Sequence, residues 1–187
     1  MNSQALWYLT RGSGVVALIL LTVAVLGGLV TFSRWSSSRW GRFVIEGLHR
    51  NLSLLSVVFI AVHIASSVLD SYVPIHWINA VLPFSATYRP LWLGLGALAL
   101  DCLVAVAVTS LLRVRIGYRS WRAVHWLAYA SWGFAVLHGL GTGSDRHQGW
   151  FLVLNLAAVG VVMVAVANRS LQPAPVPVRT DGRRAPR

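Results

Sequence analysis

Residues 48–69 (LHRNLSLLSVVFIAVHIASSVL) and residues 120–142 (SWRAVHWLAYASWGFAVLHGLGT) are two apolar stretches that each carry two histidines. The first contains His49 and His63, and the second contains His125 and His138. Each stretch supplies the ~20 residues that a helix needs to cross a bilayer. Because ionisable side chains in such segments are costly, they are functional candidates by default. These stretches therefore predict a membrane helix bundle whose functional site is formed by the histidines inside it.

The spacing of the histidines predicts two sites at different depths. At about 100° and 1.5 Å per residue, the fourteen-residue step from His49 to His63 leaves both rings within ~40° of one face and ~21 Å apart. The second stretch has a step of thirteen residues. If the two helices run in the same direction, His49 meets His125 and His63 meets His138.

Two facing imidazoles at each level favour haem. Histidine is a common axial ligand of haem iron, and helical bundles build cofactor sites from side chains on facing helices. We therefore predict two b haems, the first held by His49 and His125 and the second by His63 and His138. A single buried histidine is more often a satisfied polar group than a ligand, but four histidines in two matched pairs favour ligation.

The thirteen-residue step has a geometric consequence. In a straight helix it turns His138 ~140° away from His125. The second helix is therefore expected to contain a kink or a local change of winding, or to cross its partner obliquely. Gly133 lies between the two histidines and could permit such an irregularity.

The composition identifies an integral membrane protein. In 187 residues, 56% are hydrophobic and only 11% are charged, which is too apolar for a water-soluble domain of this size. The net charge of +11 comes from arginines that flank the apolar segments, so it indicates membrane orientation rather than a nucleic-acid partner. With Cys102 as the single cysteine, a Cys-x-x-Cys-His attachment is excluded and the haems would be held non-covalently.

We expect an all-α bundle of about five transmembrane helices within a haem domain at residues 1–170. The first apolar run exceeds the usual core of a signal peptide and has no clear cleavage site, so we interpret it as a retained span. Residues 171–187 are basic and proline-rich, and are expected to form a disordered cytoplasmic tail near anionic lipid. The expected spans are Gly14–Phe32, Leu48–Leu69, Leu91–Leu112, Ser120–Gly141 and Gly149–Asn168.

The loops alternate in charge and predict the orientation in a cell membrane. The first and third connections and the carboxyl-terminal tail are rich in arginine, whereas the other two connections hold only Arg89 and Arg146. By the positive-inside rule, the amino terminus is outside and the carboxyl terminus is cytoplasmic. His49 and His125 would then form the inner site, and His63 and His138 the outer site. The arginines of the first and third connections are Arg34, Arg39, Arg42, Arg50, Arg113, Arg115, Arg119 and Arg122.

Several polar residues are candidates for secondary roles. Arg50 and Arg122 lie close in sequence to inner ligands and could neutralise haem propionates, with ordinary positive-inside charge as the alternative. Arg89 and Arg146 could do the same outside. Asp101, in the middle of the third span, is a candidate for proton relay or quinone binding, with a structural carboxyl as the alternative.

The remaining candidates carry weaker signals. His76 and His147 fall in the outer loops and are expected to be solvated rather than ligands. Phe59 and Trp132 lie between the two haem levels, where core packing is the simpler interpretation. The long outer connection contains an apolar stretch, residues 76–82, that is expected to lie on the membrane surface and cover the outer haem.

At His49, His63, His125 and His138 the chain resembles the ferric reductase-like transmembrane domain, over roughly Trp7–Asn168. That superfamily includes NADPH oxidases, ferric-chelate reductases and the haem-binding subunit of periplasmic methionine sulfoxide reductase. The resemblance implies two b haems, with the inner one reduced from the cytoplasmic side and the outer one delivering electrons outward. The chain departs from the family in showing five spans where six are usual, and in lacking the cytoplasmic flavin and nicotinamide domain, which leaves the donor open.

The leading hypothesis is a transmembrane cytochrome b, an electron-transfer protein or oxidoreductase subunit. Electrons would come from a cytoplasmic flavoprotein, from a quinol, or from FMN or FAD bound at the inner face. The acceptor would be a ferric chelate, oxygen or a periplasmic oxidoreductase. The alternatives are a quinol-linked cytochrome of the b561 type, and a non-redox membrane protein that carries a metal ion or assists assembly.

Overall fold

The computed structural model describes residues 3–32, 42–143, 145 and 147–171, and every regular element in these ranges is a helix. The structure thereby confirms the expected all-α class. Arg34, Arg39, Arg146 and the tail from residue 172 lie outside the described residues. The helices are α1 (Ser3–Phe32), α2 (Arg42–Leu69), α3 (Trp77–Val81), α4 (Pro90–Leu111), α5 (Arg113–His125), α6 (Leu127–Thr142) and α7 (Gly149–Ser170).

Four of the described helices, α1, α2, α4 and α7, are long and apolar enough to cross a membrane. They are compatible with a multi-pass membrane protein. The expected fourth span, Ser120–Gly141, differs: the chain forms two helices that meet at Trp126, and α6 has only 16 residues. The arginine-rich first part, α5, is also interrupted at Gly117, whose φ of 80° is not helical. Within the expected span, Trp126 separates α5 from α6, and Arg122 makes the part before it less apolar than a membrane span.

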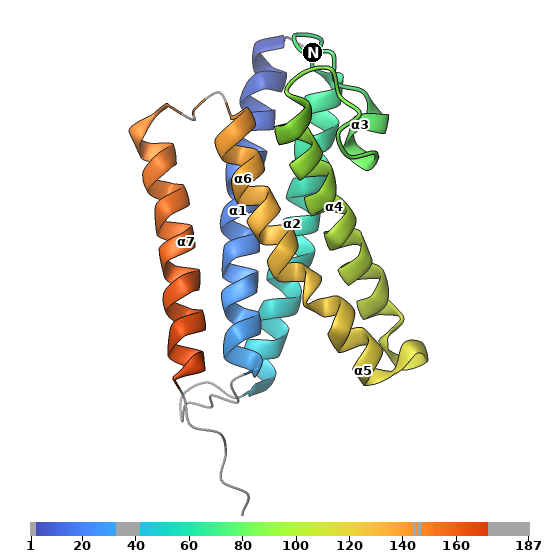
Figure 1. The fold of residues 1–187 in the computed structure, drawn as a ribbon, viewed down its shortest axis with the longest axis vertical. Helices are drawn as coiled ribbons and strands as arrows, with labels where there is room; N and C mark the ends of the chain where they lie inside the picture. Colours follow the sequence, from blue (N-terminus) through green and yellow to red (C-terminus); the bar gives the residue numbers. More distant parts are fainter. Residues whose placement is uncertain (1–2, 33–41, 144, 146, 172–187) are drawn as a thin grey trace, which may run out of the picture.

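The helices pack as two antiparallel pairs, α1 with α2 and α4 with α6, and α1 also contacts α6 and α7 (Figure 1). The most buried of the spanning helices is α1, whose inward positions carry small and medium-sized side chains such as Ala17, Leu21 and Ala24. Its Val25 and Leu29 form an apolar cluster with Val162 of α7. In contrast, most of α2 presents aliphatic side chains outward, as expected for a helix that faces lipid.

The connection between α2 and α4 folds against the end of α4. The apolar stretch predicted here forms α3, which packs on α4 (Figure 1). The ring of Phe84 lies so close to Gly94 that a Cβ atom there would be 2.2 Å from it. Arg89 donates from Nη1 to the carbonyl oxygen of Gly141 over 2.5 Å, which joins this connection to the end of α6.

Candidate functional site

The structure brings the four histidines together in the two predicted pairs. The ring centroids of His49 and His125 are 6.4 Å apart with the planes at 71°, and those of His63 and His138 are 6.3 Å apart with the planes at 85°. Helices α2 and α6 run in the same direction, so the pairs lie at two levels of the bundle (Figure 1). We call them the His49 pair and the His63 pair. The His63 pair lies toward α3, and the His49 pair lies toward α5.

The expected change of winding is present, but it lies at Trp126 rather than at Gly133. Trp126 separates α5 from α6, and the N–H of Tyr129 donates to its carbonyl oxygen over 3.1 Å, a bond between residues three apart. Such bonds tighten a helix from about 3.6 to about 3.0 residues per turn. Thirteen residues at about 100° each stop ~140° short of four full turns. Tighter winding adds rotation per residue and so brings His138 closer to the face that carries His125. Gly133 lies within α6, and a Cβ atom on it would meet nothing within 4 Å.

Three of the four rings are oriented by the backbone of a neighbouring helix. Nδ1 of His49 lies 2.9 Å from the carbonyl oxygen of Ala24, and Nδ1 of His63 lies 2.8 Å from that of Thr10, both in α1. On the other side, Nδ1 of His138 lies 2.9 Å from the carbonyl oxygen of Trp92 in α4. Because a carbonyl oxygen can only accept, each Nδ1 carries the proton and Nε2 keeps its lone pair. A hydrogen bond from Nδ1 to a backbone carbonyl oxygen is also common for histidines that bind a metal through Nε2.

His125 is the exception. Its Nδ1 is buried and has no hydrogen-bond partner among the described residues. Its ring instead packs on Trp121, with the centroids 4.9 Å apart and the planes tilted by 32°. Two contacts fix the position of the Trp121 ring. Its Nε1 donates to the hydroxyl of Ser110 over 3.2 Å, and the Arg113 guanidinium lies 4.3 Å from its ring centroid.

Glycines on the neighbouring helices give the rings their space. A Cβ atom on Gly14 would lie 2.9 Å from the ring of His63, and one on Gly96 would lie 2.6 Å from that of His138. Gly28 faces His49 at the looser distance of 3.5 Å. Gly14, Gly28 and Gly96 lie far in sequence from the histidines that they face, and the sequence alone did not indicate them as part of the site. The available signal was the fourteen-residue step from Gly14 to Gly28, which equals the step from His49 to His63.

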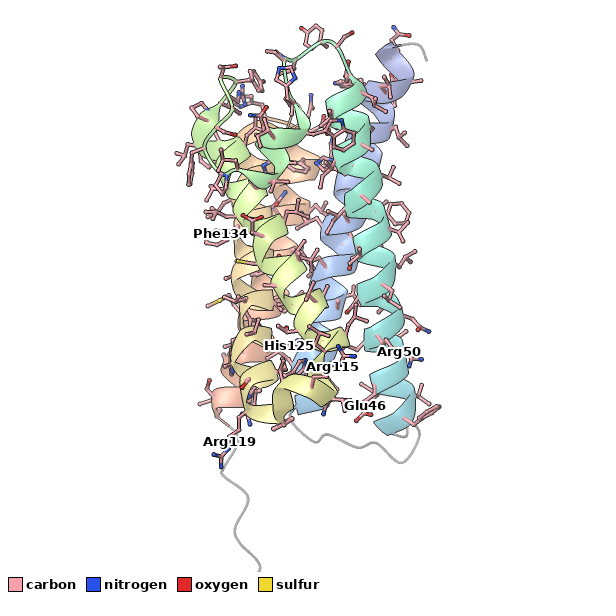
Figure 2. The ribbon with its side chains drawn as sticks, turned by 90° about the vertical axis from the view of Figure 1, so that its right-hand side faces the viewer. Glu46, Arg50, Arg115, Arg119, His125 and Phe134 are labelled. Atoms are coloured by element: carbon pink, nitrogen blue, oxygen red, sulfur yellow. The ribbon has the colours of Figure 1, made fainter. Side chains whose placement is uncertain are left out.

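The candidate arginines lie at different places. Arg50 on α2 and Arg122 on α5 are exposed near the His49 pair, as expected, and their proposed contact with propionates stays a prediction. Figure 2 shows Arg50, Arg115 and Glu46 with His125 at the end of the bundle opposite α3. Arg89, predicted to lie near the outer site, is engaged by the carbonyl oxygen of Gly141.

The other candidates are not part of the histidine pairs. His76 lies exposed at the start of α3, where its backbone N–H donates to Asn79, and His147 lies exposed between α6 and α7. Asp101 lies on an exposed face of α4. Trp132 packs against the α1 and α7 cluster, and its Nε1 donates to Thr22 Oγ1 over 3.0 Å, in agreement with the core-packing interpretation.

Each histidine pair offers two nitrogen ligands. Within the part of the chain that the structure describes, no group of three or more His, Cys, Asp or Glu side chains gathers in a way that could hold a metal ion. Each pair therefore stands as two facing imidazoles without a third ligand of these types among the described residues.

The fold and the site define an all-helical chain, compatible with a multi-pass membrane protein, with two levels of paired histidines between α2 and the α5–α6 segment. Residues 5–145 match the model of the family described as Domain of unknown function (DUF8596), so the chain belongs to this family. The matched range includes both histidine pairs and ends before α7. No curated protein and no solved structure matches the chain.

Proposed function

We propose that the protein is a transmembrane electron-transfer cytochrome b that holds one haem b in each histidine pair. His49 and His125 would hold the first haem, and His63 and His138 the second. The observation that carries the proposal is the separation of the facing rings. Two metal–imidazole bonds of about 2 Å each, and about 1 Å from each nitrogen to its ring centre, amount to about 6 Å. The two observed separations are 6.4 and 6.3 Å.

The surroundings of the rings support the same proposal. Hydrogen bonds from Nδ1 to the carbonyl oxygens of Ala24, Thr10 and Trp92 select the tautomer in which Nε2 is a ligand. Gly14 and Gly96 let the backbones of α1 and α4 approach the rings of the His63 pair. A histidine that served only as a buried polar group would need one hydrogen-bond partner, but it would not need a second histidine opposite it.

The placement of the pairs suits transfer across a membrane. The fourteen residues from His49 to His63 span ~21 Å along α2, most of the ~30 Å apolar layer. Bound haem would supply the one-electron iron couple at each level. The chain itself holds the two levels apart in fixed helices and surrounds them with apolar side chains.

The direction of transfer is part of the proposal. The positive-inside rule places the arginine-rich α5 end, with Arg50 and Arg122, in the cytoplasm. Electrons would enter at the His49 pair from a flavoprotein, a bound flavin or a quinol, and leave from the His63 pair to an outer acceptor. Arg50 and Arg122 would neutralise the propionates of the inner haem, because guanidinium matches carboxylate geometry.

The proposal is tested by replacing one ligand at a time. His63→Ala should lower the haem content from about two to about one per chain, because only the outer pair is broken. His76→Ala is the matched control, since it removes an exposed histidine near the same end. Haem content is measured against protein in detergent-purified samples. A His63→Ala protein that keeps both haems at full occupancy would refute the pairing.

Transfer across the bilayer is tested separately. The purified protein is reconstituted into vesicles that contain ferricyanide, and a membrane-impermeant reductant is added outside. Vesicles with the wild-type protein should reduce the trapped ferricyanide, whereas vesicles with His63→Ala should do so at the rate of empty vesicles. Equal rates for wild-type and empty vesicles would rule out the electron-transfer role, even if both haems were bound.

A further inference from the structure

Asp101 lies at the middle of α4, on a face that points away from the bundle. Ala99 and Val106 are buried, and the hydroxyl of Ser131 in α6 donates to the carbonyl oxygen of Ala99 over 2.7 Å. In a helix, Asp101 is turned ~160° from Ala99 and ~140° from Val106. Its side chain is accordingly exposed, and within the described residues it has no hydrogen bond or ion pair.

The depth of Asp101 leaves it far from the arginines of its own chain. It lies twelve residues from Arg89 and twelve from Arg113, the two that flank α4. This corresponds to ~18 Å along the helix in each direction. It also lies between the two histidine levels, because Gly96 contacts His138 and Ser110 binds Trp121 beside His125.

An exposed carboxyl group at this depth needs a partner. Acidic side chains in the apolar layer almost always face the interior of a bundle or pair with another polar group, because leaving them in lipid is costly. Among the described residues, no side chain forms a hydrogen bond or ion pair with Asp101, because α4 turns it outward. The partner must therefore come from another molecule in the membrane.

The surface around Asp101 has the pattern of a helix–helix interface. Val104, Val108 and Leu111 follow it at steps of three, four and three residues, and they are 51%, 46% and 85% exposed. This spacing places all four side chains on one seam, as in packed helix pairs. On the preceding turns, Ala97 is only 2% exposed and Gly94 is covered by Phe84. The seam therefore begins where the contact with the α2–α4 connection ends.

We propose that this seam, which we call the Asp101 face, binds the Asp101 face of a second copy of the chain. A two-fold axis along the membrane normal brings the same residue of two copies to the same depth. The two Asp101 carboxyl groups then meet and share a hydrogen bond, with the protonated carboxyl group donating to the other. A second copy has no arginine at this depth, so the pair is held by this bond and by close packing of the valines.

The arrangement of the interface is tested by disulfide cross-linking in native membranes. In a Cys102→Ala background, Val104→Cys and Val108→Cys place one thiol on the Asp101 face, where two copies would bring the Cα atoms within about 7 Å. The controls are Val153→Cys and Val164→Cys on α7, which are 64% and 60% exposed. With copper phenanthroline, the α4 variants should give a covalent dimer and the α7 variants should not. Equal cross-linking at both helices, or none at α4, would overturn the proposal.

The role of the carboxyl group is tested by two substitutions at one position. Asp101→Asn keeps a side chain that can donate and accept, so the dimer dissociation constant in lipid should stay close to that of the wild type. Asp101→Leu removes the bond and should raise the constant roughly 3- to 30-fold, the range of one interhelical hydrogen bond. Single-molecule photobleaching in liposomes measures both. A monomeric wild-type protein would overturn the proposal and leave Asp101 for a different membrane protein. An unchanged constant for Asp101→Leu would also contradict it.

The interface does not depend on haem. The Asp101 face lies on the side of α4 opposite α6, which carries His138. A wild-type protein that binds two haems but stays monomeric would refute only the dimer. A haem-free protein that still cross-links through Val104→Cys would refute only the proposed cytochrome.

Discussion

Replacing Gly96 with alanine should remove one of the two proposed haems. A Cβ atom at this position would lie 2.6 Å from Nδ1 and 2.7 Å from Cε1 of His138, whereas ordinary contact begins at 3.4 Å. The imidazole would have to move by about 0.8 Å, well beyond the ~0.2 Å tolerance of a metal–ligand distance. The same shift strains the hydrogen bond from His138 to Trp92. Overpacking of this kind costs about 1–3 kcal/mol.

The assay compares Gly96→Ala with Gly133→Ala by haem content and reduced-minus-oxidised absorption. Both glycines lie inside helices, but a Cβ atom on Gly133 meets nothing within 4 Å. We expect about two haems per chain for Gly133→Ala and about one for Gly96→Ala. The haem that remains at the His49 pair shows that Gly96→Ala is folded. If Gly96→Ala binds two haems with an unchanged spectrum, the placement of His138 as a ligand is wrong.

Three further predictions concern single interactions. His125 lacks the backbone hydrogen bond that orients the other three histidines. If the proposed haems are bound, carbon monoxide should displace His125 first and bind about one haem per chain in the reduced protein, and equal binding at both levels in one titration would argue against this. Asp145→Ala breaks the ion pair with the partly exposed Arg11 and should cost about 1–3 kcal/mol in thermal unfolding, so a change under about 0.5 kcal/mol would show that the pair is not stabilising. Trp132→Phe removes the hydrogen bond to Thr22 and should cost about 1 kcal/mol without loss of haem, whereas loss of haem would contradict its packing role.

The approach of the four histidines could be predicted from the sequence because it depends on helix geometry and on the direction of the two helices. The rise per residue fixes the distance from His49 to His63, and the alternation of arginines gives α2 and the following histidine-bearing segment the same direction. Neither quantity is sensitive to the details of side-chain packing. The two ring pairs therefore follow from counting residues, although their cofactor stays a prediction.

The features that the sequence did not reveal depend on contacts between distant residues. Gly14 and Gly96 lie far from the histidines they contact, in helices that had no visible part in the site. Gly133 could have permitted the change of winding, but the structure has it at Trp126, beside the arginine-rich α5. The outward direction of Asp101 could not be predicted either, because it depends on which face of α4 packs against α6.

The most direct test of the proposed function is the haem stoichiometry of the wild-type protein. The chain is expressed with sufficient haem, purified in mild detergent, and measured by its reduced-minus-oxidised absorption spectrum and by pyridine haemochrome content per chain. The paired histidines predict a b-type spectrum and about two haems per chain. A colourless protein under these conditions would contradict the proposal and would favour a role for the four histidines without haem.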